Sequence, residues 1–302
     1  MTAASSAINP TTAIPLIGYT TDPATVVGDW SVAPTCGVYT TADTGFATAL
    51  TGTQPASTYV THCSGGTSTN YNPTSYVDGS LVIDGSVPTV GVTSLPVFES
   101  GLRFTVKWTA SGGVTSITNT DVRYRKALWN ASLPNTYTTW KSRVTARSAT
   151  FTGTQGYKYC FSTRARNQIG NESVWSAEKC TLVPFDERTL ATTGAWTKST
   201  PSGWVAKTAL QATTKGAALA TKTSVSVKRI GLIALKCKDC GSVTVQVGTF
   251  TKAVSLAGGS KAGTRTLFTV TLPSKKTGKV LIIVTSKAGK VVKIDGLDLS
   301  TT

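Results

Sequence analysis

The sequence has 302 residues, a formal net charge of +16, and only one histidine and one methionine. It contains no run of about 18 apolar residues, which excludes a membrane span, and the single histidine leaves little room for histidine-based catalysis or a histidine-ligated zinc. Thr, Val and Tyr are abundant and Glu is scarce, so the composition favours an all-β protein with many short strands and polar turns.

The charge is unevenly distributed along the chain. Residues 1–85 carry −5, residues 86–190 carry +7 and residues 191–302 carry +14. A chain of this length suggests two or three domains. We expect three tandem β-sandwich or Ig-like modules, at residues 1–85, 86–185 and 191–302. The basic last module would attract polyanions, unless its lysines only form a solvated surface.

The six cysteines fall in three pairs, Cys36 with Cys63, Cys160 with Cys180, and Cys237 with Cys240. Fifteen pairings are open to six cysteines, but pairing within a module is economical because each module should fold alone. Disulfides predict an oxidising, extracellular or cell-surface location. The start, "MTAASSAINPTTAIPLIGYT", does not have the features of a signal peptide, so we expect an export signal upstream or a fragment.

In the first module, residues 57–63 and 80–84 are expected to be strands, separated by the polar stretch 64–75. His62 is expected to be an ordinary histidine at a strand end. Residues 56–83 resemble the end of the short surface repeats called MBG domains. The residues that carry the resemblance are Tyr59, Asn70, Tyr71, Tyr76, Val77, Gly79, Leu81 and Val82.

The second module resembles a fibronectin type III domain along nearly its whole length. The matching stretches are 102–111, 117–127, 148–153 and 157–176. The resemblance makes Trp108 the core tryptophan and Tyr159 the tyrosine that bonds back to the chain. It also places Cys160 and Cys180 on neighbouring strands, within reach of a bridge. The segment 175–190 has the form seen in secreted actinobacterial proteins that carry such domains in series.

The third module has five predicted strands, at residues 224–235, 242–248, 266–272, 279–286 and 291–300. It resembles the jelly-roll, carbohydrate-binding-like β-sandwich that often follows fibronectin type III domains in secreted actinobacterial proteins. The resemblance rests on Trp196, on residues 215–235 and on the closing "KIDGLDLS".

Cys237 and Cys240 lie between two predicted strands, with Lys236 and Lys238 beside them. A structural zinc site needs four ligands, and a thioredoxin-type site needs a helix start in a βαβ setting. We therefore favour a disulfide clip on a hairpin turn, with a free dithiol and a metal site as the alternatives.

We predict no catalytic residues, metal or cofactor. The acid pairs that could act as a glycosidase pair are Asp295 with Asp298, and Asp186 with Glu187. Asp295 and Asp298 lie on either side of Gly296, and we expect a strand bend with a solvated acid there instead. The candidate ligand-binding residues are Trp196 and Trp204, which could stack on a sugar or simply pack on strands, and Lys236, Lys238, Lys275 and Lys276. These four lysines would attract a polyanion together with Lys279, Lys287, Lys290 and Lys293. Lysines without interleaved aromatic residues argue against a nucleic-acid partner.

The sequence therefore predicts a non-enzymatic extracellular surface or adhesion protein. Its first two modules would be spacers, and its last would bind a carbohydrate or an anionic cell-wall polymer. The alternatives are an accessory region of a larger secreted hydrolase or phage tail fibre, a purely structural spacer, or a secreted enzyme that uses Asp295 and Asp298.

Overall fold

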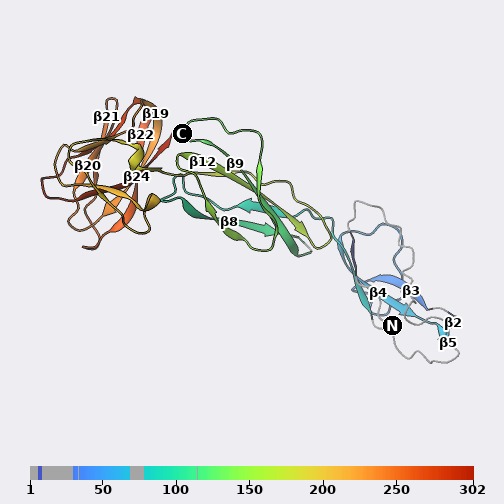
Figure 1. The fold of residues 1–302 in the computed structure, drawn as a ribbon. Coiled ribbons are helices and arrows are strands. Elements are labelled where there is room, and N and C mark those ends of the chain that lie inside the picture. The colour runs from blue at the N-terminus through green and yellow to red at the C-terminus, as the bar shows by residue number, and fades with distance from the viewer. Residues whose placement is uncertain (1–5, 9–29, 33, 69–77, 114) are drawn as a thin grey trace.

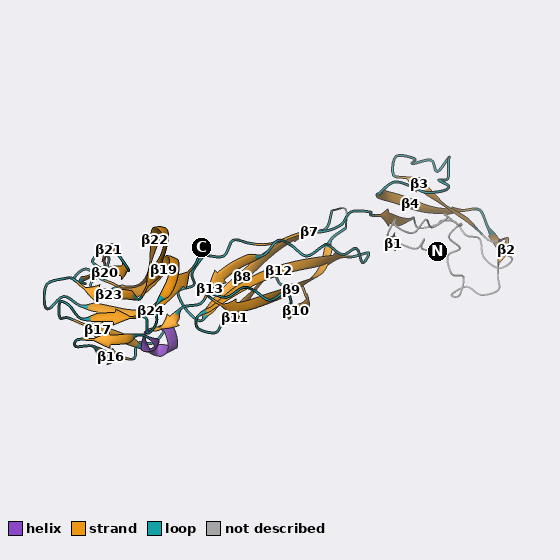
Figure 2. Ribbon diagram, turned by 90° about the horizontal axis from the view of Figure 1, so that it is seen from above, coloured by secondary structure: helices purple, strands orange, loops and turns teal. Residues whose placement is uncertain are grey.

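A computed structural model describes residues 6–8, 30–32, 34–68, 78–113 and 115–302. The described chain is built almost entirely of β-strands, which confirms the all-β fold class (Figures 1 and 2). Its strands form groups that follow one another in chain order, from blue through green to red in Figure 1. Within the described residues, no helix has the length and apolar character that crossing a membrane requires.

The first group is a small sheet with a limited apolar core. Val38, Tyr59 and Leu81 are its buried apolar side chains. The disulfide Cys36–Cys63 joins directly opposed residues of two neighbouring strands. The sheet order is β1 (Ser6–Ile8), β6 (Gly79–Ile83), β4 (Ser57–Ser64) and β3 (Thr35–Thr40), and β2 (Trp30–Val32) pairs separately with β5 (Thr67–Ser68). Of the residues that resemble MBG domains, Asn70, Tyr71, Tyr76 and Val77 lie outside the described residues.

The chain leaves this sheet at Asp84, which is fully buried against the second group. The Asp84 carboxylate accepts hydrogen bonds from the backbone N–H groups of Ser86 and Thr115, at 2.8 and 3.1 Å, and from the Asn167 amide. The Asn171 side chain donates to the Asp84 carbonyl. Burial alone would raise the pKa of Asp84, but the hydrogen bonds from Ser86 and Thr115 lower it.

The second group is a β-sandwich with the sheet arrangement of a fibronectin type III domain. One sheet has the order β11 (Ser148–Thr152), β8 (Arg103–Ser111), β7 (Thr89–Val92), and the other has the order β10 (Thr138–Val144), β9 (Ile117–Leu128), β12 (Tyr157–Asn167), β13 (Lys179–Leu182). Trp108 is buried in the core and donates its ring N–H to Thr120. The Tyr159 hydroxyl accepts the backbone N–H of Thr154 at 2.8 Å.

The disulfide Cys160–Cys180 joins opposed residues of β12 and β13. An arginine–aromatic stack lies on the same sheet, because the Arg123 guanidinium is 3.6 Å from the Tyr137 ring centre and 4.0 Å from that of Trp175. One face of each of these two rings is thus covered by Arg123 within the module.

The third group is a larger sandwich. One sheet has the order β16 (Thr197–Ser199), β17 (Ala209–Ala212), β24 (Val292–Ser300), β19 (Val225–Lys236), β22 (Thr264–Gly278), with β14 (Phe185–Asp186) also pairing with β24. The other has the order β15 (Ala191–Thr193), β18 (Ala218–Ala220), β23 (Val280–Val284), β20 (Ser242–Val247), β21 (Phe250–Ser255). From β17 to β24 successive strands lie in opposite sheets, except that β20 and β21 pair in one sheet, which is the order of an eight-stranded jelly roll.

The second and third groups share an apolar interface. Phe98, Trp129 and Leu182 belong to the same apolar cluster as the core of the third sandwich. Phe185 and Asp186 form β14, which pairs with β24 of the third sandwich. Residue 185, the expected end of the second module, therefore pairs with the third module. A Cβ atom on Gly231 of β19 would lie 2.9 Å from the Phe98 ring, so the close docking of Phe98 requires glycine at this position.

Candidate functional site: the clip end of the third sandwich

Four connections meet at one end of the third sandwich, which we call the clip end. They are residues 213–217, 236–241, 256–263 and 285–291, the segments between strands β17 and β18, β19 and β20, β21 and β22, and β23 and β24. Backbone hydrogen bonds join these segments, from Cys237 N–H to the Leu256 carbonyl, from Gly241 N–H to the Val291 carbonyl and from Gly289 N–H to the Thr213 carbonyl. The four loops therefore form one connected surface.

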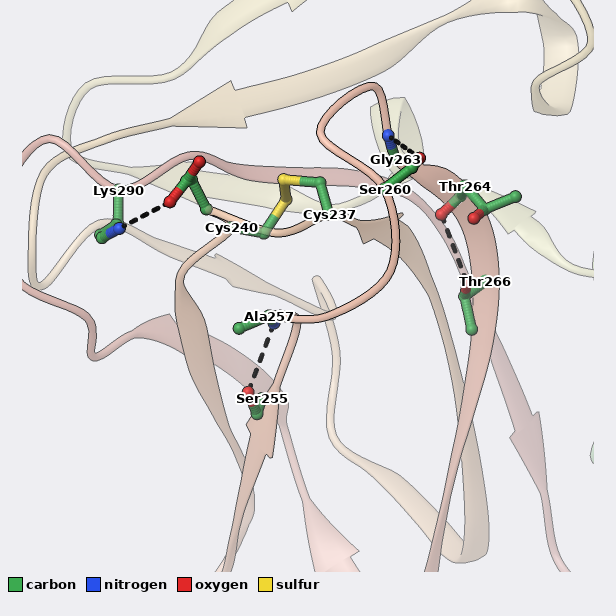
Figure 3. The surroundings of a disulfide bond; sticks show 10 residues. Cys237, Cys240, Ser255, Ala257, Ser260, Gly263, Thr264, Thr266 and Lys290 are labelled. Atoms are coloured by element: carbon green, nitrogen blue, oxygen red, sulfur yellow. Dashed lines mark hydrogen bonds and ion pairs between the residues drawn. A yellow bond between two sulfur atoms is a disulfide. The ribbon is translucent and has the colours of Figure 1, made fainter.

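The disulfide Cys237–Cys240 lies at the centre of this end (Figure 3). Both cysteines are buried, and each forms an isolated bridge to another loop, Cys237 to Ala257 and Cys240 to Val291. The expected hairpin turn is wrong, because β19 and β20 belong to opposite sheets and the clip lies in the crossover between them. Because Cys237 N–H and its carbonyl both bond to the 256–258 segment, the clip fixes loops that carry charge.

Lysines surround the clip on all four loops. The exposed ones are Lys215, Lys238, Lys261, Lys287 and Lys290, and Lys236 is half-buried at the end of β19. The acid of the four loops is Asp239, which pairs with Lys290 at 3.5 Å. Both partners of this pair are at least half exposed, so solvent screens the interaction and it neutralises the end only weakly. The clip end is therefore strongly basic.

The structure places Lys236 and Lys238 at the clip end but Lys275 and Lys276 elsewhere. In the pairing of β19 with β22, Lys236 is opposite Thr264 while Val227 is opposite Lys276. The two lysine pairs thus lie at opposite ends of one strand pair, nine residues or about 30 Å apart. The four candidate lysines do not form one surface, because β22 continues as a strand through Lys275 and Lys276 where the sequence analysis expected a turn.

Lys287 and Lys290 are among the lysines expected to attract a polyanion, whereas Lys215 and Lys261 are not. Each lies within two residues of a glycine in a predicted turn, for example in "TTKGA" and "GSKAG". That pattern marks an exposed loop lysine, but it does not say which loops meet at the same end of the sandwich. Only the order of the strands in the two sheets supplies that information.

Both candidate tryptophans are half-buried and packed within the third sandwich. The Trp196 ring N–H donates to the carbonyls of Thr193 and Ala218, and the ring packs on the apolar core. Since Ala218 begins β18 directly after the 213–217 loop, Trp196 lies at the rim of the clip end. Trp204 lies on the outer face of the other sheet, where the Lys293 ammonium is 5.8 Å from its ring centre.

The acids Asp186, Glu187 and Asp295 are all buried, and so is Asp298, which means that the expectation of a solvated acid at Asp295 and Asp298 is wrong. The Asp295 carboxylate accepts the backbone N–H of Val205 at 2.8 Å and pairs with Arg265. Asp295 therefore holds the turn that follows Trp204. Burial raises its pKa to about 6, although Arg265 acts in the opposite direction.

Glu187 is the least compensated acid of this group. Burial raises its pKa to about 7 against a hydrogen bond with Thr208, and the negative charges of Asp186 and Asp295 add to the rise. One of its carboxylate oxygens has no hydrogen-bond partner. Asp186, by contrast, pairs with Arg188 at 2.6 Å.

Asp298 is buried in a different setting, at the interface with the second module. Among the residues that the structure describes, neither of its carboxylate oxygens has a hydrogen-bond partner. Burial raises its pKa well above the usual range, and the charge of Glu99 adds to the shift. Glu99 belongs to the second module and accepts a hydrogen bond from Thr181. Asp298 thus faces Glu99, whereas the charges that act on Asp295 are those of Arg265 and Asp186.

Two other groups could suggest chemistry. His62 pairs with Asp78 at 2.6 Å and stacks on the Phe46 ring, whose centre is 3.7 Å away. Among the described residues, Cys160, Glu178 and Cys180 have ligand atoms close enough for a metal ion, but the two cysteines are joined in a disulfide. Glu178 is occupied by Arg125 at 2.7 Å.

No family model matches the chain, and no curated protein matches it. Several solved structures resemble it at low identity. Carbohydrate-binding modules of the β-sandwich superfamily are 12% identical with a TM-score of 0.35, covering 71% of this chain and 98% of theirs. Fibronectin(III)-like modules of CbhA from Clostridium thermocellum are 14% identical with a TM-score of 0.29, covering 60% and 90%. An exo-beta-1,3-galactanase from Phanerochaete chrysosporium is 14% identical with a TM-score of 0.29, covering 80% and 78%.

Proposed function

We propose that this chain is a non-enzymatic extracellular binding protein whose clip end holds an anionic polysaccharide or cell-wall polymer. The observation that carries the proposal is the grouping of Lys215, Lys236, Lys238, Lys261, Lys287 and Lys290 on four connected loops with the single acid Asp239. The first and second modules are spacers in this proposal, and the setting is a bacterial surface of the actinobacterial kind. The three disulfides favour an extracellular location.

Charge is the attractive force at this end. Exposed ammonium groups attract a polymer over about a Debye length, roughly 8 Å at physiological ionic strength, and salt weakens the attraction. Lysine ammonium groups are compact point charges that suit phosphates and carboxylates without demanding one fixed geometry. Rigid loops place these charges in advance, which reduces the entropy that binding would otherwise cost.

The burial of the acids favours a binding function over a hydrolytic one. Asp295 is engaged by Val205 and Arg265, and Asp298 is closed off at the module interface. A glycosidase needs two carboxyl groups facing a sugar in an open cleft, about 5–10 Å apart. We therefore assign both acids to the packing of the module rather than to catalysis.

The experiment compares two five-lysine variants of the full chain. One replaces Lys215, Lys238, Lys261, Lys287 and Lys290 at the clip end with Gln, and the control replaces Lys222, Lys252, Lys275, Lys276 and Lys279 near the opposite end. Both variants lose the same net charge. Binding to immobilised dextran sulfate, to teichoic acid and to uncharged dextran is measured at low salt.

We expect the clip-end variant to lose at least about tenfold in affinity for the anionic polymers, since each lysine near an anionic surface contributes up to about 1 kcal/mol. The control variant should lose much less, and dextran should bind none of the proteins. Equal losses in the two variants would show that net charge rather than the clip end governs binding. Equal binding of dextran would replace the proposal with a neutral-sugar lectin.

A further inference from the structure

A cavity of about 270 Å³ lies between the second and third modules. Its lining residues are Pro96, Val97, Phe98, Arg229, Leu267, Thr269 and Thr271. A second cavity of about 160 Å³ shares Val97 and Arg229 with it and is also lined by Lys158 of the second module. Arg229 therefore stands at the junction of two adjoining hollows in the joint between the modules.

Arg229 is positioned by the central strand of its sheet. In β19 it is opposite Thr271 of β22 on one side and Ser300 of β24 on the other. In the described part of the chain its guanidinium has no hydrogen bond or ion pair, although the residue is only partly exposed. Other arginines of the second and third modules are paired with carboxylates, namely Arg125, Arg164, Arg166, Arg188 and Arg265.

The walls of the larger cavity combine three kinds of chemistry. Pro96 and Val97 are exposed apolar residues contributed by the second module. Thr269 and Thr271 are exposed hydroxyl residues on the facing strand of the third module. An arginine fork binds a carboxylate through two parallel hydrogen bonds, hydroxyl groups bond to sugar hydroxyls, and apolar residues cover the C–H face of a pyranose ring.

We propose that this joint is a binding site for a single uronic acid unit, with the sugar carboxylate on Arg229. A pyranose ring fits the larger cavity, and the shared lining with the second cavity gives a chain of such sugars a path toward Lys158. The site is separate from the clip end and does not depend on it, because the clip end lies at the Val292 end of β24 while Ser300 lines the second cavity at the other end.

The site exists only when the two modules are docked, since each contributes one wall. Gly231 makes that docking close, because a Cβ at this position would meet the Phe98 ring. A bound uronate therefore bridges the modules and should stiffen the joint. Ligand sites are common at such interfaces between domains.

The experiment titrates the full chain with galacturonic acid and with trigalacturonate, followed by calorimetry and by the amide signals of residues 97–98 and 267–271. Galactose and inorganic phosphate are the comparison ligands. Arg229→Gln should weaken uronate binding at least about tenfold, and Arg229→Lys should restore only part of it. Arg103→Gln, a change at an exposed arginine outside the cavity, should leave binding intact.

Gly231→Val provides a second variant that keeps Arg229 but separates the walls, and it should also abolish uronate binding. The proposal is overturned if wild-type protein binds neither uronate, or if Arg229→Gln binds them as wild type does. Phosphate that binds as tightly as trigalacturonate would also overturn it, because the site would then recognise any anion. The clip-end lysine variant should bind trigalacturonate in this cavity normally, so failure of one site is distinguishable from failure of the other.

Discussion

At the scale of single residues, the most unusual group is the carboxyl of Asp298. It is almost completely buried, it has no hydrogen bond on either oxygen, and the nearby acid Glu99 comes from the second module. An ionised carboxylate in such a position is costly, so the group keeps its proton well above the pH at which an exposed aspartate loses it. The pKa of Glu99 is also raised, to about 6, by burial.

This arrangement predicts how stability depends on pH. An acid whose pKa is raised in the folded state binds more protons when folded than when unfolded, so the free energy of unfolding falls as pH rises through that range. We expect the midpoint of thermal unfolding to decrease from about pH 5 to pH 8. Asp298→Asn, which cannot ionise, should flatten the decrease and melt higher than wild type at the upper pH.

Asp295 and Glu187 contribute in the same direction, because their pKa values are raised to about 6 and about 7. Wild type and Asp298→Asn are therefore compared over the whole range, with the exposed Asp239→Asn as a matched control. Identical slopes for wild type and Asp298→Asn would contradict this account. The sequence could not predict this behaviour, since an aspartate between apolar strand residues gives no sign that another module covers it.

At the scale of elements, the disulfide Cys237–Cys240 fixes the surrounding loops and adds little to the stability of the whole fold. Cys237 and Cys240 are only three residues apart, so their bond removes little entropy from the unfolded chain. Its effect is local, because its two ends bond to the 256–258 segment and to Val291. The clip thus determines how the charged loops are held.

We expect the double variant Cys237→Ser, Cys240→Ser to unfold at nearly the wild-type temperature. Hydrogen exchange should nevertheless become faster in residues 236–241 and 256–263, and binding to anionic polymer should weaken. The comparison is Cys160→Ser, Cys180→Ser, which opens a loop of 20 residues and should cost about 3 kcal/mol of stability. If hydrogen exchange in residues 236–241 stays at the wild-type rate, the disulfide does not hold these loops in place.

The positions of the strands along the chain were easier to predict than the partners with which they pair. The apolar runs correctly marked β20 and β24, and the resemblance to a fibronectin type III domain correctly marked β8 and β9. Buried and more exposed residues alternate in β8 and β20, as in a strand with one face in the core, whereas β24 is buried at nearly every position. The partner of each strand was not predictable. The hairpin expected at Cys237 was wrong because β19 and β20 lie in opposite sheets, whereas the next two strands, β20 and β21, do form a hairpin, and a local pattern contains no information about that choice.

At the scale of the whole molecule, the joints between modules were the part that the sequence could not show. Phe98, Trp129 and Leu182 are apolar residues of the second module, and nothing in their spacing says that they pack on the third. The same holds for Asp84, whose hydrogen bonds hold the exit from the first sheet against the second module. Charge asymmetry indicated separate modules, whereas contacts between modules depend on surfaces that meet only after folding.

The candidate site, too, could be predicted from the sequence only in part. The sequence predicted that the last module is basic, which Lys236 and Lys238 illustrate, but it joined them to Lys275 and Lys276 at the opposite end of β19 and β22. The clip end consists of four loops that are far apart in the sequence and become neighbours only in the folded sandwich. The central claim is that these loops, and not the net charge of the chain, hold an anionic polymer.

The most direct test is co-sedimentation of the full chain with Gram-positive bacterial cell walls, before and after their anionic polymers are removed, at low and high salt. We predict binding at low salt that is lost both on removal of the polymers and at high salt, and that is already weak for the clip-end lysine variant. Binding that persists without the polymers, or that the clip-end variant retains in full, would contradict the claim.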